Sequence, residues 1–442
     1  MPKHPLTENI YDKLVNDEDA RACDSIPDGA CKEVPGNFLK TLITLFLTKL
    51  GDALVNPKIT LPWLLQSLGA PMWMLGWLVP IRESGSMLPQ LAIASAVRRM
   101  EVRKWMWVLG SVLQAVCIAL IALTAFTLEG TFAGWSILAL LVVFSLSRGL
   151  SSVSSKDVLG KTIPKHRRGI LNGWAESGAG LITLVVAVLL ISGLVSGVSN
   201  GGDTALYAFG FAGAALLWLV AAVIYATISE QPGDTEGGRN GLLEAFSRVA
   251  LLKTDTHFRH FLIARSMMLC SALSAPFVVV LAQQEMDAMI SLLALFMASS
   301  GLASLVSGPF WGRFADVSSR LVMIRAGMMA AMVGVLVFVI AMFATDWLSQ
   351  IWLLPLLYFV LSIAHQGVRL GRKTYVVNMA DGNKRTDYVS VGNTLIGVVL
   401  LLMGFVSSLE PLIGISGVIC VLSGMGFVGS WMATRLPEVE KI

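Results

Sequence analysis

The sequence predicts an all-α membrane protein in which twelve transmembrane helices form two pseudo-symmetric six-helix bundles. Of its 442 residues, 55% are hydrophobic and 14% are charged, which is far more apolar than an ordinary soluble protein. Long apolar runs, and basic residues gathered on one side of them, support the same class. The net charge of +4 is too small to indicate nucleic-acid binding.

Twelve apolar runs are long enough to span a bilayer, whose hydrocarbon core of about 30 Å takes roughly 20 residues of helix. Because lipid leaves no water for open backbone groups, continuous runs of this length are expected to be helices. The predicted helices cover residues 39–65, 71–97, 105–128, 133–155, 169–193, 205–228, 260–283, 289–311, 321–344, 350–368, 388–408 and 412–433.

Polar segments divide these helices into domains. The first 36 residues carry eight acidic side chains and lack the features of a cleavable signal, so residues 1–36 are predicted to be a cytoplasmic tail. Residues 229–259, which begin with "SEQPGDTEGGRNG", are the predicted cytoplasmic linker. The six-helix bundles are then 37–228 and 260–433, and residues 434–442 form a second cytoplasmic tail.

Basic residues indicate the orientation. With the N-terminus inside, 28 of the 33 Lys and Arg residues fall in the tails, the inner loops and the inner ends of helices, and five lie in helix interiors. The outer loops hold none of them, but they hold acids such as Glu129, Asp203 and Asp346. By the positive-inside rule, both termini are predicted to be cytoplasmic in a multi-pass protein of the plasma (inner) membrane.

An internal repeat relates the two bundles. An offset of 217 residues places Arg103 on Arg320 and Lys156 on Lys373, and it places Arg148 of the fourth helix on His365 of the tenth. Transporters are commonly built from such repeats, with the binding site between them near the middle of the membrane.

The first predicted helix carries charges in its interior, in "TKLGDALVNPKITLPWLL". Lys49 and Asp52 are three residues apart, so they share a helix face and can pair. Asn56 extends that face by a turn, and Pro57 can bend the helix. Since a charge near the bilayer centre costs at least about 2.5 kcal/mol, this helix is predicted to line a water-filled cavity.

Three acids within the helices are candidate carriers of a coupling proton: Asp52, Glu83 and Glu176. Burial raises the pKa of a carboxyl group and a neighbouring cation lowers it. A movement of the helices that changes either one can therefore switch the protonation of the carboxyl group. For Asp52 the alternative is a structural ion pair with Lys49. Arg82 points about 100° away from Glu83, so these two side chains are expected to have partners on other helices.

The remaining ionisable side chains within helices have two interpretations each. Arg148 can bind a carboxylate or phosphate of the substrate, or it can be a structural partner of Asp52 or Glu83. His365 can sense a proton, or it can be a packing residue. Lys58 and Arg265 are expected to extend toward the membrane interfaces.

The segment "GRFADVSSR", which follows the eighth helix, resembles the loop signature of the major facilitator superfamily, Gly-x-Leu-Ala-Asp-Arg-x-Gly-Arg-Lys. Gly312, Phe314, Ala315, Asp316 and Arg320 stand in the matching places. The resemblance implies a latch in which the glycine permits close approach of two helices and the aspartate favours a helix N-terminus and pairs with arginine. The alternative is a solvated turn.

The first-half counterpart, "SAVRRMEVRK", keeps Arg103 and Lys104 of this signature and has Arg99 where the family's acid would stand. "LPWLLQSLGAP" and "RGLSSVSSKDVLGKTIPKHRRG" also resemble the family, so the resemblance covers residues 39–433. It implies that helices one, four, seven and ten line a central cavity.

These features favour a secondary active transporter that moves a small solute by rocking two halves, coupled to protons. The sequence has no Gly-x-x-x-x-Gly-Lys-Ser/Thr loop for direct use of ATP. Cations within the helices outnumber acids by five to three, which favours an anionic or zwitterionic solute. The alternative is a protein of the same fold that serves as an assembly factor or receptor and transports nothing.

An enzymatic function is not expected, because the sequence has no HExxH or CxxC motif. The five cysteines show no metal-ligand spacing, so neither a metal nor a cofactor is expected. The expected partners are the lipid bilayer, a small-molecule solute and protons, and the expected state is a monomer.

Overall fold

The computed structural model describes residues 11, 32–90, 93, 96, 97, 99–164, 167–191, 204–233, 235, 251–286, 290–379 and 382–439. The regular elements in these residues are helices, which confirms the all-α class. The first 31 residues, apart from Tyr11, and most of the predicted linker lie outside the described residues, so the domain boundaries stay predictions.

The helices of the first half follow the predicted runs closely. They are α2 (Val34–Leu54), α3 (Thr60–Ser67), the 3₁₀ turn η2 (Met72–Met74), α4 (Leu75–Met87), α6 (Lys104–Thr127), α7 (Gly130–Thr162), α8 (Arg168–Ile191) and α9 (Thr204–Ala226).

The second half has the corresponding series. It comprises α11 (Leu251–Thr254), α12 (Thr256–Met267), α13 (Cys270–Leu273), α14 (Ala275–Glu285), α15 (Ile290–Val317), α16 (Ser319–Phe343), the 3₁₀ turn η4 (Thr345–Trp347), α17 (Leu353–Asn378), α18 (Gly382–Ser407) and α19 (Glu410–Thr434). Each of the twelve predicted runs overlaps helix in the structure.

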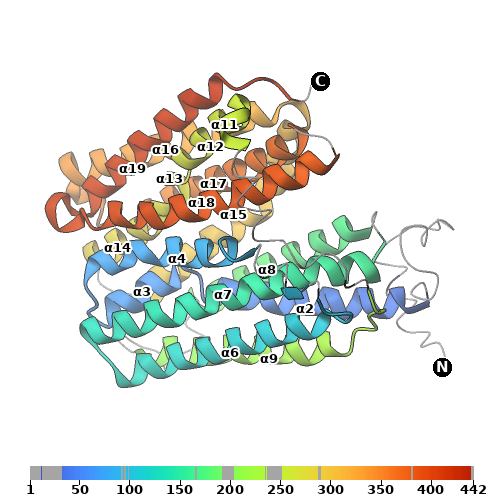
Figure 1. Cartoon of the computed structure of the whole chain (residues 1–442). Helices are drawn as coiled ribbons and strands as arrows, with labels where there is room; N and C mark the ends of the chain where they lie inside the picture. The colour runs from blue at the N-terminus through green and yellow to red at the C-terminus, as the bar shows by residue number, and fades with distance from the viewer. Residues whose placement is uncertain are drawn as a thin grey trace.

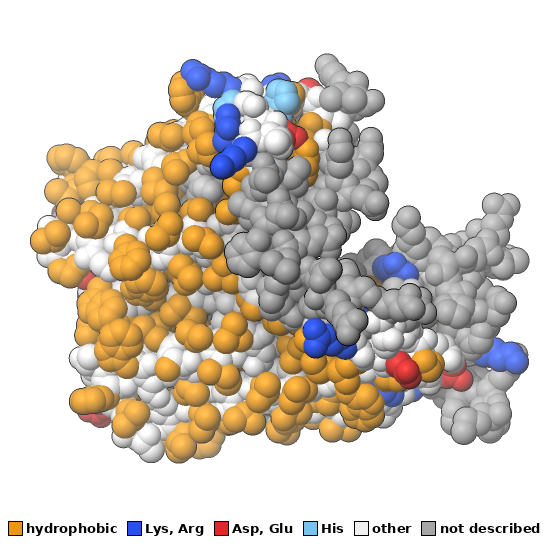
Figure 2. Space-filling model, in the orientation of Figure 1, with side chains coloured by type: hydrophobic (Ala, Val, Ile, Leu, Met, Phe, Trp, Pro, Cys, Tyr) orange, Lys and Arg blue, Asp and Glu red, His pale blue; other side chains and the backbone are white. Residues whose placement is uncertain are grey.

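Length and composition agree with membrane crossing for most of these helices. Within the described residues, eight helices are long and apolar enough to span a bilayer, and shorter apolar helices lie at Ser177–Leu189 and Val391–Ser407. On α6, the exposed side chains Leu109, Leu113, Val116, Leu120 and Leu123 recur every three or four residues and form one apolar stripe. Figure 2 shows hydrophobic side chains over most of the described surface on this face.

The two halves pack in the same internal pattern. In the first half α6 packs against α7 and α9, and in the second half α16 packs against α17 and α19. The halves join where α4 packs against α18 and α8 packs against α15. Figure 1 shows the helices of the first half in one layer and those of the second half in the other.

A glycine allows the close approach of α4 and α18. A Cβ atom added to Gly76 would lie only 1.7 Å from Oγ of Ser407. Since real side chains do not tolerate such a distance, a residue larger than glycine would push the two helices apart.

The first helix of each half is interrupted at equivalent places. In the first half α2 ends at Leu54 and α3 begins at Thr60, with Pro57 in the intervening turn. In the second half the helix is broken into α12, α13 and α14 between Met267 and Ala275. An offset of 217 residues places the first break, residues 55–59, on residues 272–276, which include the interruption at Ser274 between α13 and α14. Such interrupted helices are typical of binding sites in transporters.

Candidate functional site

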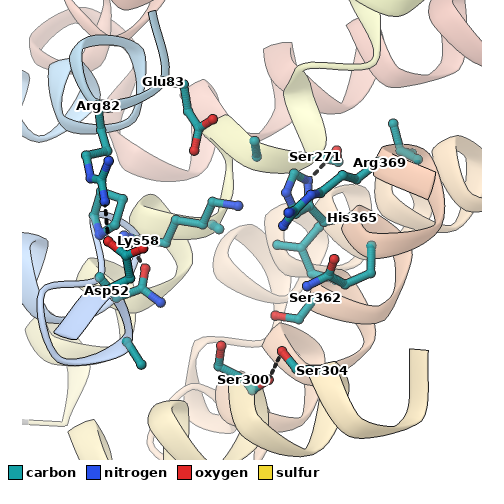
Figure 3. A pocket seen from close by; sticks show the side chains of 18 of the residues that line it. Asp52, Lys58, Arg82, Glu83, Ser271, Ser300, Ser304, Ser362, His365 and Arg369 are labelled. Atoms are coloured by element: carbon teal, nitrogen blue, oxygen red, sulfur yellow. Dashed lines mark hydrogen bonds and ion pairs between the residues drawn. The ribbon is translucent and has the colours of Figure 1, made fainter. Parts of the chain in front are cut away.

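A cavity of about 450 Å³ lies between the two halves. The first half contributes residues of α2, the α2–α3 turn, α4, α7 and α8. The second half contributes residues of the α12–α13 turn, α13, α14, α15, α17 and α18. Figure 3 shows side chains from both halves pointing into this space. Of the predicted site residues, Lys49, Asp52, Asn56, Arg82, Glu83, Arg148 and His365 line it.

Asp52 joins three helices of the first half. Arg82 of α4 donates to Oδ1 of Asp52 at 2.6 Å, and Arg148 of α7 donates to the same oxygen. Arg82 is only 6% exposed, and its guanidinium also lies 4.5 Å from the ring centroid of Phe144. Arg148 is therefore a structural partner of Asp52, which was one of its two interpretations.

Lys49 and Asn56 support this group from the same helix and turn. Lys49 interacts electrostatically with Asp52, which also forms ion pairs with Arg82 and Arg148. Oδ1 of Asn56 accepts the backbone N–H of Lys58 at 2.9 Å, which fixes the turn between α2 and α3. Asn56 thus shapes the break in the first helix.

Lys58 lies in that break and not at the membrane interface. Its side chain extends across the cavity toward the second half, and Glu83 points into the same space from α4 (Figure 3). Glu83 interacts electrostatically with Lys58, but among the described residues its carboxylate has no hydrogen bond or ion pair. The expectation that Lys58 reaches the interface is wrong, because the turn at Pro57 directs it inward.

His365 occupies the place in the second half that Arg148 occupies in the first. Its Nδ1 lies 3.2 Å from Oγ of Ser271 on α13, so α17 contacts the broken first helix of its half as α7 contacts α2. Both side chains line the cavity. The offset of 217 residues therefore relates two positions that both line the cavity.

Three cavity residues, Arg369, Arg372 and Lys373, were missed by the sequence prediction. The predicted tenth helix ended at residue 368, whereas α17 continues to Asn378. A signal was available, since His365, Arg369 and Arg372 are spaced by four and three residues and so share one helix face.

For two of the predicted acids, Glu176 and Asp316, the structure describes the backbone but not the side chain. The backbone of Glu176 lies in α8 and that of Asp316 in α15, but both side chains lie outside the described residues. Gly312 and Asp316 were expected in a loop, and this is wrong because α15 continues to Val317. A Cβ atom added to Gly312 would meet nothing within 4 Å, so close helix approach does not require this glycine.

The arginines of the predicted latch pair within their own halves. Arg103 forms an ion pair with Asp157 at 3.1 Å, and its backbone N–H donates to Glu230 at 3.0 Å. Arg320 forms an ion pair with Glu438 of the C-terminal segment at 2.8 Å and donates to the carbonyl oxygen of Leu436. We call the end that holds these groups, where α6 and α16 begin, the basic end.

Arg265 of α12 also differs from its prediction. It is 6% exposed, and it donates to Oδ1 of Asn393 on α18 at 3.0 Å. The expectation of an interfacial side chain is wrong, because α12 is covered by α18 and α19 at this point.

The halves contact each other at the end opposite the basic end. Gln283 of α14 donates to the carbonyl oxygen of Trp63 at 3.5 Å and to Oγ of Ser67 at 3.4 Å, both on α3. Trp63 is fully buried. Figure 1 shows α3 and α14 side by side at the end away from the marked termini. These contacts join the two halves at that end.

The sequence matches the family model of the Major Facilitator Superfamily over residues 41–402. No curated protein matches it. Among solved structures, the chain is similar to a POT family transporter in complex with 5-aminolevulinic acid, with a TM-score of 0.67, 12% identity and coverage of 92% of this chain and 97% of that chain.

Two further solved structures share the arrangement. A D-xylose-proton symporter has a TM-score of 0.67 and 14% identity, covering 91% of this chain and 98% of its own. A mutant of the nucleoside transporter NupG has a TM-score of 0.63 and 13% identity, covering 90% of this chain and 99% of its own. At these identities the likeness shows a shared fold.

Proposed function

This chain belongs to the Major Facilitator Superfamily, and from that premise we propose that it is a secondary active transporter that moves a small solute by alternating access, coupled to protons. The observation that carries the proposal is the charged cavity of about 450 Å³ between the two halves. Ionisable groups within a membrane are costly, and they mark the paths of solutes and ions.

We assign the basic end to the cytoplasm, with both termini inside and the protein in the plasma (inner) membrane. The α3–α14 contacts then close the outer side, and the cavity faces inward. Rocking the halves about the α4–α18 and α8–α15 contacts would open the outer side in turn.

Glu83 is the acid that we propose as the carrier of the coupling proton. Asp52 pairs with Arg82 and Arg148, and protonation of its carboxylate would remove the counter-charge that both guanidinium groups share. Glu83 faces the cavity without a hydrogen bond or ion pair among the described residues. A solute that approaches Lys58 changes the charge near Glu83, which links occupancy to protonation.

A non-transporting assembly factor or receptor of the same fold is the second candidate. Such a protein has no need of charges inside the membrane, and a cavity lined by both halves with Asp52, Glu83 and seven Lys or Arg side chains favours transport. One of the structures with this fold is named a D-xylose-proton symporter, which supports proton coupling as the proposal for this chain.

The test uses the full chain in proteoliposomes that contain a pH-sensitive dye, screened with metabolites and drugs under an imposed pH gradient. We expect solute-dependent proton entry in the wild type. Glu83→Gln should lose proton movement and keep solute exchange, because glutamine preserves the shape of the site. Asp346→Asn, an exposed acid in η4, is the matched control.

Two results would redirect the proposal. If Glu83→Gln keeps coupling, Glu83 does not carry the proton. If no solute moves in the wild type, with or without the gradient, the receptor candidate replaces the transporter.

A further inference from the structure

The cavity has a strong excess of positive charge. Among the described residues, seven of the lining side chains are Lys or Arg, and two, Asp52 and Glu83, are acids. Asp52 is shared by two arginines, so it offsets the charge of one of them. The cavity therefore needs further negative charge to be balanced when it closes away from water.

The excess is concentrated on α17. Arg369 and Arg372 are one helical turn apart, and the lining residues of the second half that the structure describes include no Asp or Glu. Among the described residues, neither guanidinium has a hydrogen bond or ion pair, and Nε of Arg372 is buried without a hydrogen-bond partner. Guanidinium groups offer planar, paired donors to carboxylates and phosphates.

The first half supplies a third cation to the same space. In Figure 3 the ammonium group of Lys58 approaches from the opposite wall, toward Arg369 and His365. Glu83 attracts Lys58, whereas Arg369 and Arg372 repel it. The two arginines also repel each other. An anion placed between the three would turn this repulsion into attraction.

We propose that the transported solute is an organic anion, whose carboxylate or phosphate group is bound between Arg369 and Arg372 of α17 and Lys58 of the α2–α3 turn. This inference rests on the proposed transport function and adds the substrate class. Because the cations come from both halves, the bound anion draws the halves together around it. Ser300, Ser304 and Ser362 line the same wall and provide hydrogen bonds for a hydroxylated part of the solute.

The test measures ligand-dependent thermal stabilisation of the purified full-length protein. Two matched series serve as probes: glycerol, lactate and glycerol phosphate, and glucose, glucuronate and glucose phosphate. We expect an acidic member to raise the melting temperature while its neutral counterpart does not. If the carboxylates raise the melting temperature more than the phosphates do, the site binds a carboxylate. The reverse order indicates a phosphate.

Site variants locate the binding. Arg369→Gln and Lys58→Gln should each lower the affinity for the acid by about 10- to 100-fold, as expected for the loss of a hydrogen bond to a charged group. Arg435→Gln is the control, since Arg435 lies at the end of α19 and stacks on Trp431 outside the cavity. It should bind the acid as the wild type does.

The inference is overturned if neutral members bind as well as acidic ones, if no acidic member stabilises the protein, or if Arg369→Gln binds the acid unchanged. Flux measurements in proteoliposomes separate this failure from failure of the transport proposal. If only a neutral solute shows proton-coupled flux, the transport proposal is supported and the anion site is refuted. If an acid binds but shows no flux, the anion site is supported and the transport proposal is refuted.

Discussion

Arg82 of α4 donates to Oδ1 of Asp52 on α2 at 2.6 Å, inside the part of the first half that we assign to the membrane. Arg148 of α7 donates to the same oxygen, so one carboxylate connects three helices. Asp52, Arg82 and Arg148, which we call the trio, together carry a net charge of +1 on the cavity wall.

We predict that Asp52→Asn lowers the stability of the protein. The substitution leaves Arg82, which is 6% exposed, without a counter-ion, and breaking a buried pair in this way costs on the order of 3 kcal/mol. The measurement is the unfolding temperature in detergent. Asp52→Asn combined with Arg82→Gln should recover part of the loss. An unfolding temperature for Asp52→Asn equal to that of Asp346→Asn would contradict the role of the trio.

Gly76→Ala should also destabilise the protein, because the new Cβ atom would lie 1.7 Å from Oγ of Ser407. Overpacking of this kind typically costs about 1–3 kcal/mol. Ser407→Gly in the same chain should restore stability, since it removes the obstructing side chain. Gly210→Ala on α9, where a Cβ atom meets nothing within 4 Å, is the control and should not destabilise. A Gly76→Ala protein as stable as this control would mean that α4 and α18 are farther apart.

Asp255 predicts an acid-sensitive contribution to stability. Its Oδ1 accepts the N–H of Phe258 at the start of α12, and its Oδ2 accepts the hydroxyl of Tyr388. Burial acts to raise the pKa of this carboxyl, but the hydrogen bonds outweigh burial and hold the pKa below its usual value. The contribution is therefore present above the ordinary Asp pKa of about 4 and is lost as the pH falls below it.

Unfolding temperatures across the acidic range test this contribution. The wild type should exceed Asp255→Asn near neutral pH, and the difference should shrink as the pH falls below about 4. In Tyr388→Phe, which loses one hydrogen bond to the carboxylate, the contribution at neutral pH should be smaller and its loss should be complete at a higher pH. A difference that stays constant with pH would show that Asp255 contributes no charge-dependent stability.

The class and the helices could be predicted from the sequence because they depend on local hydrophobicity. The positions of Asp52, Glu83 and Arg148 on a cavity followed from the cost of charge in lipid. The pairing of Asp52 with Arg82 could not be predicted, since it depends on how α2 and α4 pack. Lys49 was the nearer choice in the sequence, but the interhelical contact supplies the close ion pair.

The errors concern helix ends and side-chain direction. Arg369 and Arg372 were missed because the apolar run stops at residue 368, although the helical face continues past it. Gly312 and Asp316 were assigned to a loop because polar residues begin there, whereas α15 extends beyond the apolar segment. In both cases the helix leaves the apolar region before it ends.

Chemical labelling of introduced cysteines tests the central claim, that these ionisable side chains line an aqueous cavity between the halves. Ser300→Cys and Ser362→Cys place a thiol in the cavity, and Val223→Cys places one on the outer face of α9, where the side chain is 68% exposed. Each is made without the five native cysteines and treated in membranes with an impermeant maleimide from the cytoplasmic side. We predict that the two cavity thiols react and that Val223→Cys, covered by lipid, does not. Reaction at Val223→Cys with inert thiols at positions 300 and 362 would contradict the account.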